Sequence, residues 1–220
     1  MEIIGLIGPN GAGKTTFIDA ISGFADATGS VTLEGDSLDG QRPPYQRSRH
    51  GLGRTFQGIE LYDDLSVREN VAVGTTAARH RPNTATLGDD DLDRLFELWH
   101  LTPPVVDRQV KELSQGGQRQ LVSVARALAG RPRVVLLDEP AAGLDSTESL
   151  WLGHRLRAIR DAGVTVVMID HDMELVLAVC DRIVVLDLGK VIAIGTPPTR
   201  SAAIPLSRAP TSAPPIPTRS

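Results

Sequence analysis

A glycine-rich turn near the start of the chain has the residue types and the spacing needed to bind phosphate. Glycines let the backbone turn tightly, so that successive N–H groups point inward at the start of the following helix, where anions bind. We expect Lys14 to bring a mobile positive charge to the terminal phosphates and Thr15 to offer its hydroxyl to Mg²⁺. The turn consists of Gly8, Pro9, Asn10, Gly11, Ala12, Gly13, Lys14, Thr15 and Thr16.

Two adjacent acidic residues, Asp138 and Glu139, follow a short apolar run at 134–137. A buried strand that ends in an acid places a carboxylate at the edge of the sheet where α/β folds bind ligands. Asp138 suits a Mg²⁺ site, and Glu139 could orient and deprotonate an attacking water. Such a pair is common at solvated strand ends, but the phosphate-binding turn upstream favours a functional role for it.

The elements that must position these groups follow from the hydrophobic pattern. Apolar runs at 3–7, 134–137, 164–169 and 183–186 do not alternate between apolar and polar residues, which predicts strands covered on both faces. Helical stretches at 14–22, 118–129, 147–162 and 173–179 lie between them. This order predicts an α/β fold with a mostly parallel sheet and right-handed crossovers.

Three segments depart from this pattern. Residues 31–35 predict part of an antiparallel β arm, and the polar segment from about 66 to 117 predicts an inserted helical subdomain. From residue 196 to 220 the chain is rich in Pro, Ser and Thr, with few large apolar residues, which predicts a disordered tail.

The amino-acid composition excludes some classes of function. With 220 residues, of which 41% are hydrophobic, the chain can build one sizeable core. A net charge of −4 argues against a general nucleic-acid binder. Because no apolar run approaches the roughly 20 residues of a membrane-spanning helix, we expect any membrane role to come through a partner.

Further motifs, in their order after the glycine-rich turn, resemble those of the ATP-binding cassette (ABC) ATPases. The resemblance extends from the first residues to about residue 196, and its motifs are specific. It implies a P-loop NTPase core within an ABC ATPase domain at 1–195, with a signature helix that ends at 129. The motifs are the signature residues Ser114, Gln115, Gly116, Gly117 and Gln118, the Q-loop residue Gln57, the switch histidine His171 and the D-loop residue Asp145.

The resemblance also implies a role for each matching residue. ATP and Mg²⁺ would be the ligands, with Thr15, Gln57 and Asp138 at the metal. Glu139 and His171 would be the catalytic residues, the second through a contact to the γ-phosphate. The signature residues would act on the nucleotide of a second ATPase subunit, identical or paralogous, packed head to tail.

Within ABC ATPases the chain most resembles those for uptake of branched-chain or other hydrophobic amino acids. This resemblance implies a subunit on the cytoplasmic face of the membrane, bound to transmembrane permease subunits and served indirectly by a solute-binding protein. A cassette for urea or lipopolysaccharide, or a non-transport or regulatory ABC ATPase, is the alternative. The stretches that carry the resemblance to the amino acid uptake group are 53–57, 65–71, 138–145, 171–175, 181–186 and 189–192.

The signature departs from the family pattern by one residue. Counting back from Ala125 places Gln115 where the family has serine, whereas counting forward from Leu113 keeps Ser114 there and leaves one extra residue before the helix. We favour Ser114, because the glycines that follow can absorb a one-residue bulge.

The start of the chain also differs from the family. The run at 3–7 begins at the third residue, whereas the resemblance implies about two earlier strands, including an aromatic residue that stacks on adenine. We therefore expect an incomplete antiparallel arm and an unpaired sheet edge that favours aggregation. We also expect little preference for ATP over GTP, because stacking on a base is worth roughly 1–3 kcal/mol.

Overall fold

The computed structural model describes residues 1–38, 42–81, 84–101, 103–113 and 116–197. The strands in these ranges are β1 Ile3–Ile7, β2 Thr32–Leu33, β3 Asp36–Ser37, β4 Leu52–Arg54, β5 Val134–Asp138, β6 Thr165–Ile169, β7 Arg182–Asp187 and β8 Lys190–Gly195. The helices are α1 Lys14–Ser22, α2 Pro44–Arg49, α3 Val67–Gly74, α4 Thr76–Arg79, α5 Asp89–Leu98, the 3₁₀ helix Val110–Glu112, α6 Gly117–Ala129, α7 Ser146–Asp161 and α8 Met173–Val179.

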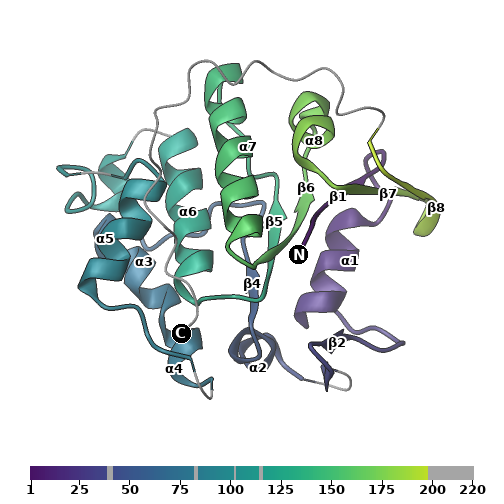
Figure 1. Cartoon of the computed structure of the whole chain (residues 1–220), viewed down its shortest axis with the longest axis horizontal. Coiled ribbons are helices and arrows are strands. Elements are labelled where there is room, and N and C mark those ends of the chain that lie inside the picture. The colour runs from purple at the N-terminus through teal and green to yellow at the C-terminus, as the bar shows by residue number, and fades with distance from the viewer. Residues whose placement is uncertain (39–41, 82–83, 102, 114–115, 198–220) are drawn as a thin grey trace.

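The main sheet has the strand order β4-β5-β6-β1-β7-β8, and β1 lies at its centre (Figure 1). All neighbouring strands from β4 to β7 are parallel, and only the edge strand β8 runs antiparallel to β7. The predicted α/β fold with a mostly parallel sheet is confirmed. In the part of the chain that is described, no helix is long and apolar enough to cross a membrane.

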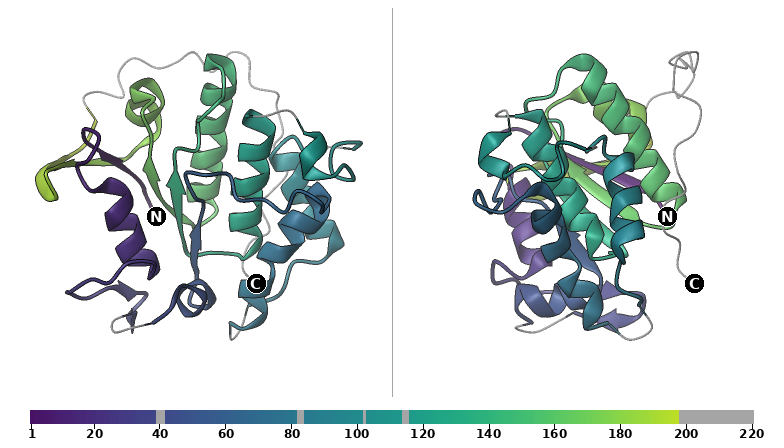
Figure 2. Two further views of the ribbon diagram at one scale, coloured as in Figure 1. Left: turned by 180° about the vertical axis from the view of Figure 1, so that it is seen from behind. Right: turned by 90° about the vertical axis from the view of Figure 1, so that its left-hand side faces the viewer.

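Helices cover both faces of this sheet, which explains why its central strands β1, β5 and β6 are mostly apolar. Along β5, Val135 and Leu137 pack into the larger core with α6, α7 and α8, whereas Leu136 packs into the smaller core with Ile18 of α1. In the side view of Figure 2 the strands run between α1 and α7. Successive side chains of a strand therefore point to opposite faces of the sheet. Because both faces are buried, the side chains on each face must be apolar.

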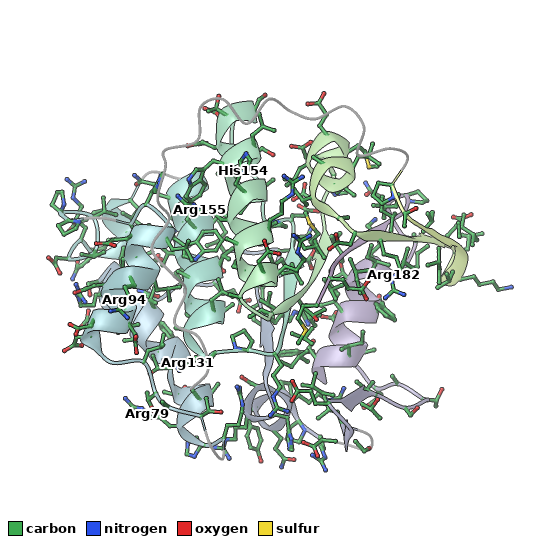
Figure 3. All side chains as sticks on the ribbon, viewed as in Figure 1. Arg79, Arg94, Arg131, His154, Arg155 and Arg182 are labelled. Atoms are coloured by element: carbon green, nitrogen blue, oxygen red, sulfur yellow. The ribbon has the colours of Figure 1, made fainter. Side chains whose placement is uncertain are left out.

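A helical insertion, which we define as residues 67–112, stands beside α6 (Figure 1). Ser66 begins α3 with a capping box, in which its hydroxyl accepts from the Glu69 N–H at 3.1 Å. Helix α3 ends against α6 at Gly74, where a Cβ would lie 2.0 Å from the Arg126 carbonyl oxygen. Arg131, labelled in Figure 3, pairs with Asp91 at 3.2 Å and ties α5 to the end of α6.

Several elements were not expected from the sequence. β4 spans three residues, with Gly53 at its centre, which is too short to give a hydrophobic pattern. All six residues of β8 are exposed, although 191–194 is an apolar run of the kind that marks a buried strand. The predicted antiparallel arm is present as the β2–β3 hairpin. The domain limits 1–195 and 66–117 stay predictions, and so does the disordered tail, since 198–220 lies outside the described residues.

Candidate active site

The glycine-rich turn joins the C-terminal end of β1 to the first turn of α1. Gly13 lies just before the helix with φ at +95°, a left-handed conformation that glycine adopts readily, and it gives the helix no side-chain cap. The Lys14 side chain is buried, and its Nζ donates to the carbonyl oxygens of Gly8 and Pro9 at 2.7 and 3.0 Å. The backbone thus holds the ammonium group inside the turn.

Asp138 ends β5 and is only 2% exposed. Its N–H donates to Thr55 Oγ1 at 3.1 Å, while its Oδ2 is buried with no hydrogen-bond partner among the residues described. Burial, and then the neighbouring charge of Glu139, raise the pKa of Asp138, although Arg54 and Lys14 act in the opposite direction. A buried carboxylate oxygen without a donor is a suitable ligand for a cation.

The oxygen donors near this carboxylate suit Mg²⁺ better than a metal ion that is coordinated only by protein side chains. Over the described residues, no group of three or more His, Cys, Asp or Glu side chains could enclose an ion. Mg²⁺ usually takes one or two protein oxygens and completes its shell with phosphate and water. Thr15 lines the pocket described next, which Asp138 does not line although it adjoins Glu139 there, and both side chains carry oxygen donors of this kind.

Glu139, Gln57 and His171 meet at one carboxylate oxygen. Gln57 Nε2 donates to Glu139 Oε1 at 3.2 Å, and His171 Nε2 lies 2.7 Å from the same atom. These side chains and the glycine-rich turn line one pocket of about 400 Å³. The lining residues are Asn10, Gly11, Ala12, Gly13, Lys14, Thr15, Thr16, Gln57, Glu139, Ile169 and His171.

The backbone of Glu139 is held in an uncommon conformation that the sequence did not reveal. Its φ is +50°, in the left-handed region that non-glycine residues seldom adopt. The Glu139 N–H donates to the Ile169 carbonyl at 2.8 Å. Its carbonyl accepts from Ala142 N and from Gln120 Nε2, each at 3.0 Å. No motif spacing could have indicated the contact with Gln120, because a helix from another part of the sequence supplies it.

Arg54 is a second residue that the motif analysis did not single out. It forms an ion pair with Asp19 of α1 at 2.6 Å and donates to Ser22 Oγ at 2.5 Å. Its guanidinium lies over the rings of Phe24 and Phe56, 5.2 and 4.7 Å from their centroids. These contacts fasten the segment before Gln57 to the helix that follows the glycine-rich turn.

The signature and D-loop residues are placed apart from this pocket. Gly116, Gly117 and Gln118 lie at the start of α6, and none of them lines the pocket. Asp145 caps α7, because its Oδ1 accepts from Thr147 N and Glu148 N, each at 2.8 Å. Ser114 and Gln115 lie outside the described residues, so the choice between the two signature registers stays a prediction.

Comparison with known proteins agrees with this geometry. Residues 1–142 match the family described as "ABC transporter". The chain is 37% identical over 214 residues to the high-affinity branched-chain amino acid transport ATP-binding protein LivG of Salmonella typhimurium, and the match covers 89% of this chain and 81% of LivG. It is 36% identical to the spermidine/putrescine import ATP-binding protein PotA of Pseudomonas fluorescens, with 89% of this chain and 52% of PotA covered.

A solved structure of similar shape is a dimeric ATP-binding cassette bound to ADP and phosphate after hydrolysis. It superposes with a TM-score of 0.76 at 28% identity, over 90% of this chain and 86% of that one. The fold, the nucleotide-binding turn and these matches agree. The chain belongs to the ABC transporter family and is one of its ATP-binding, ATP-hydrolysing subunits.

Proposed function

We propose that this subunit powers the uptake of branched-chain or other hydrophobic amino acids, with Glu139 as its catalytic base. The observation that carries the mechanism is the meeting of Gln57 and His171 at one oxygen of Glu139, beside the phosphate-binding turn. The substrate class is supported by the similarity to LivG. Because PotA is nearly as similar, another transported substrate remains the alternative.

In this mechanism Lys14 and the N–H groups of the turn bind the β- and γ-phosphates of ATP. Thr15 and Asp138 would hold Mg²⁺, which neutralises charge on the phosphates. A water next to Glu139 attacks the γ-phosphorus, its proton passes to the Glu139 carboxylate, and the bond to the ADP oxygen breaks. His171 and Gln57 orient the carboxylate, and the His171 ring lies at the pocket where it can contact the γ-phosphate.

The replacement Glu139→Gln tests this assignment. It keeps the shape of the side chain but removes the base, so hydrolysis should fall by a factor of about 100 or more while nucleotide binding persists. ATP turnover and the affinity for a fluorescent nucleotide are measured side by side. His171→Ala should also lower turnover. A Glu139→Gln protein that hydrolyses ATP at the parental rate would remove Glu139 from the catalytic role.

A second ATPase subunit and a permease complete the proposed machine. The dimeric cassette of similar fold supports head-to-tail pairing, in which α6 of one subunit presents its start to the nucleotide of the other. A pocket of about 420 Å³ between the core and the helical insertion supports docking of a transmembrane helix. Its lining includes Phe56, which adjoins Gln57, so a docked helix could move the Q-loop. Such docking would place the subunit on the cytoplasmic face of the membrane.

Docking at this pocket can be separated from catalysis. Val73 lines the pocket and is 37% exposed, so Val73→Glu should leave the fold and the ATPase activity of the isolated chain intact. Co-purification with permease subunits from native membranes should be lost, because a charge would be buried in the contact. Retained co-purification would place the docking surface elsewhere. Uptake of labelled leucine against labelled putrescine by the reconstituted complex then decides the substrate class.

A further inference from the structure

One buried side chain connects the first turn of α6 to the turn after β5. Gln120 is 2% exposed, and its Nε2 donates to the carbonyl oxygen of Glu139 at 3.0 Å. The neighbouring Arg119 bonds in another direction, toward the helical insertion and the segment before it. Its guanidinium donates to Val110 O at 3.1 Å and pairs with Asp63 at 2.7 Å. The first turn of α6 is therefore bonded to the helical insertion on one side and to the Glu139 backbone on the other.

The same two segments also touch through their glycines. A Cβ on Gly143 would lie 3.2 Å from the Gly116 Cα, and a Cβ on Gly117 would lie 2.7 Å from Leu144 Cδ2. Because these close contacts leave little free space, we expect a shift at the start of α6 to displace the turn after β5. The hydrogen bond from Gln120 then transmits that shift to the backbone of Glu139 itself.

The Glu139 backbone depends on such support. A non-glycine residue in the left-handed region is disfavoured by roughly 1–2 kcal/mol and persists only where surrounding contacts fix it. The Gln120 amide is the side-chain donor at the Glu139 carbonyl, whereas the bonds to Ile169 and Ala142 are formed by backbone. If it is lost, the two backbone bonds remain, and we expect the peptide to be held less firmly and the carboxylate to shift relative to Gln57.

We propose that Gln120 is a positioning residue, which couples the start of the signature helix to the orientation of the Glu139 carboxylate. This inference rests on the proposed function, in which Glu139 is the base and the signature acts on the nucleotide of the second subunit. The start of α6 would then serve two sites, touching one nucleotide in trans and setting the base of its own subunit in cis.

The test is Gln120→Met, which keeps the length of the side chain and removes its donor. We expect kcat to fall about tenfold, equivalent to about 1.4 kcal/mol, with KM and nucleotide affinity changed by less than about twofold. Gln109→Met is the control, because that amide also donates to a backbone carbonyl, at Asp64, but neither residue lines the pocket. Its kcat should be unchanged.

A role through Glu139 also predicts non-additivity. In a Glu139→Gln background, measured by single-turnover hydrolysis, Gln120→Met should lower the residual rate by less than twofold. An equal tenfold loss in both backgrounds, or a loss confined to KM, would overturn the coupling. If Glu139→Gln stalls hydrolysis while Gln120→Met is silent, only this inference fails. If Glu139→Gln itself is silent, the proposed function fails first.

Discussion

Replacement of Asn70 should lower the free energy of unfolding more than replacement of most other polar residues, although Asn70 lies outside the pocket. It is fully buried in α3, and its amide bonds to the segment 62–66 that follows the Q-loop. Its Nδ2 lies 3.0 Å from Tyr62 O, 3.3 Å from Leu65 O and 3.0 Å from Ser66 O, while its Oδ1 accepts from Tyr62 N at 2.9 Å.

The magnitude follows from this geometry. Two amide hydrogens can satisfy two of the three carbonyls fully, so with the accepted bond three hydrogen bonds are lost in Asn70→Ala. At about 1 kcal/mol each, the free energy of unfolding should fall by about 3 kcal/mol. For a chain of this size that loss lowers Tm by roughly 6–12 °C.

Urea and thermal unfolding followed by tryptophan fluorescence measure this loss, since Trp99 is fully buried. Gln109→Ala is the control, because it removes an exposed amide bonded to the Asp64 carbonyl and should cost less than about 0.5 kcal/mol. Asn70→Asp should also destabilise, because a carboxylate cannot donate to the carbonyls. A loss below about 1 kcal/mol for Asn70→Ala would refute the reasoning.

Four further predictions concern the pocket, the packing of the helical insertion and the signature. Asp138→Asn should abolish hydrolysis yet raise Tm at about pH 7, because the raised pKa of Asp138 means that its ionised form destabilises the fold. This increase in Tm should shrink in acid, where the wild-type carboxyl is protonated. Thermal melts of both proteins at neutral and acidic pH measure the difference. Gly74→Ala should cost about 1–3 kcal/mol in urea unfolding, because its Cβ would meet the Arg126 carbonyl, whereas Gly195→Ala, with open space around it, should be near neutral. Competition titration should give similar affinities for ATP and GTP, since no Phe, Tyr or Trp is among the described residues lining the pocket; strong ATP selectivity would contradict this. Ser114→Ala should lower ATPase activity more than Gln115→Ala, and the reverse order would favour the other signature register.

The central sheet and the glycine-rich turn were predictable because each depends on contiguous residues. Strands covered on both faces read as continuous apolar runs, and β1, β5, β6 and β7 each contain such a run. A parallel sheet then places the ends of β1, β5 and β6 at one edge. That rule alone brings Lys14, Glu139 and His171 to one pocket.

The supports of the site could not be predicted in the same way. The contact between Gln120 and Glu139, the contacts of Arg54 with the rings of Phe24 and Phe56, and the amide bonds of Asn70 join residues from separate segments. Polar residues of these types are common throughout the sequence, and only the packing of the folded chain determines which group each side chain contacts. The strand β4 was missed because a three-residue strand gives no hydrophobic pattern, whereas β8 was missed although its residues 191–194 form an apolar run.

The central place of β1 constrains the order in which the molecule can fold. β1 is the first strand along the chain, yet its neighbours are β6 and β7, at 165–169 and 182–187. On the ribosome, at roughly 5–20 residues per second, β1 must wait on the order of ten to forty seconds for both partners. The glycine-rich turn therefore has no sheet to anchor it until most of the chain has been made. Nucleotide binding should then be among the last properties that the nascent chain acquires, and the contacts that form β1 should lie late on the folding pathway.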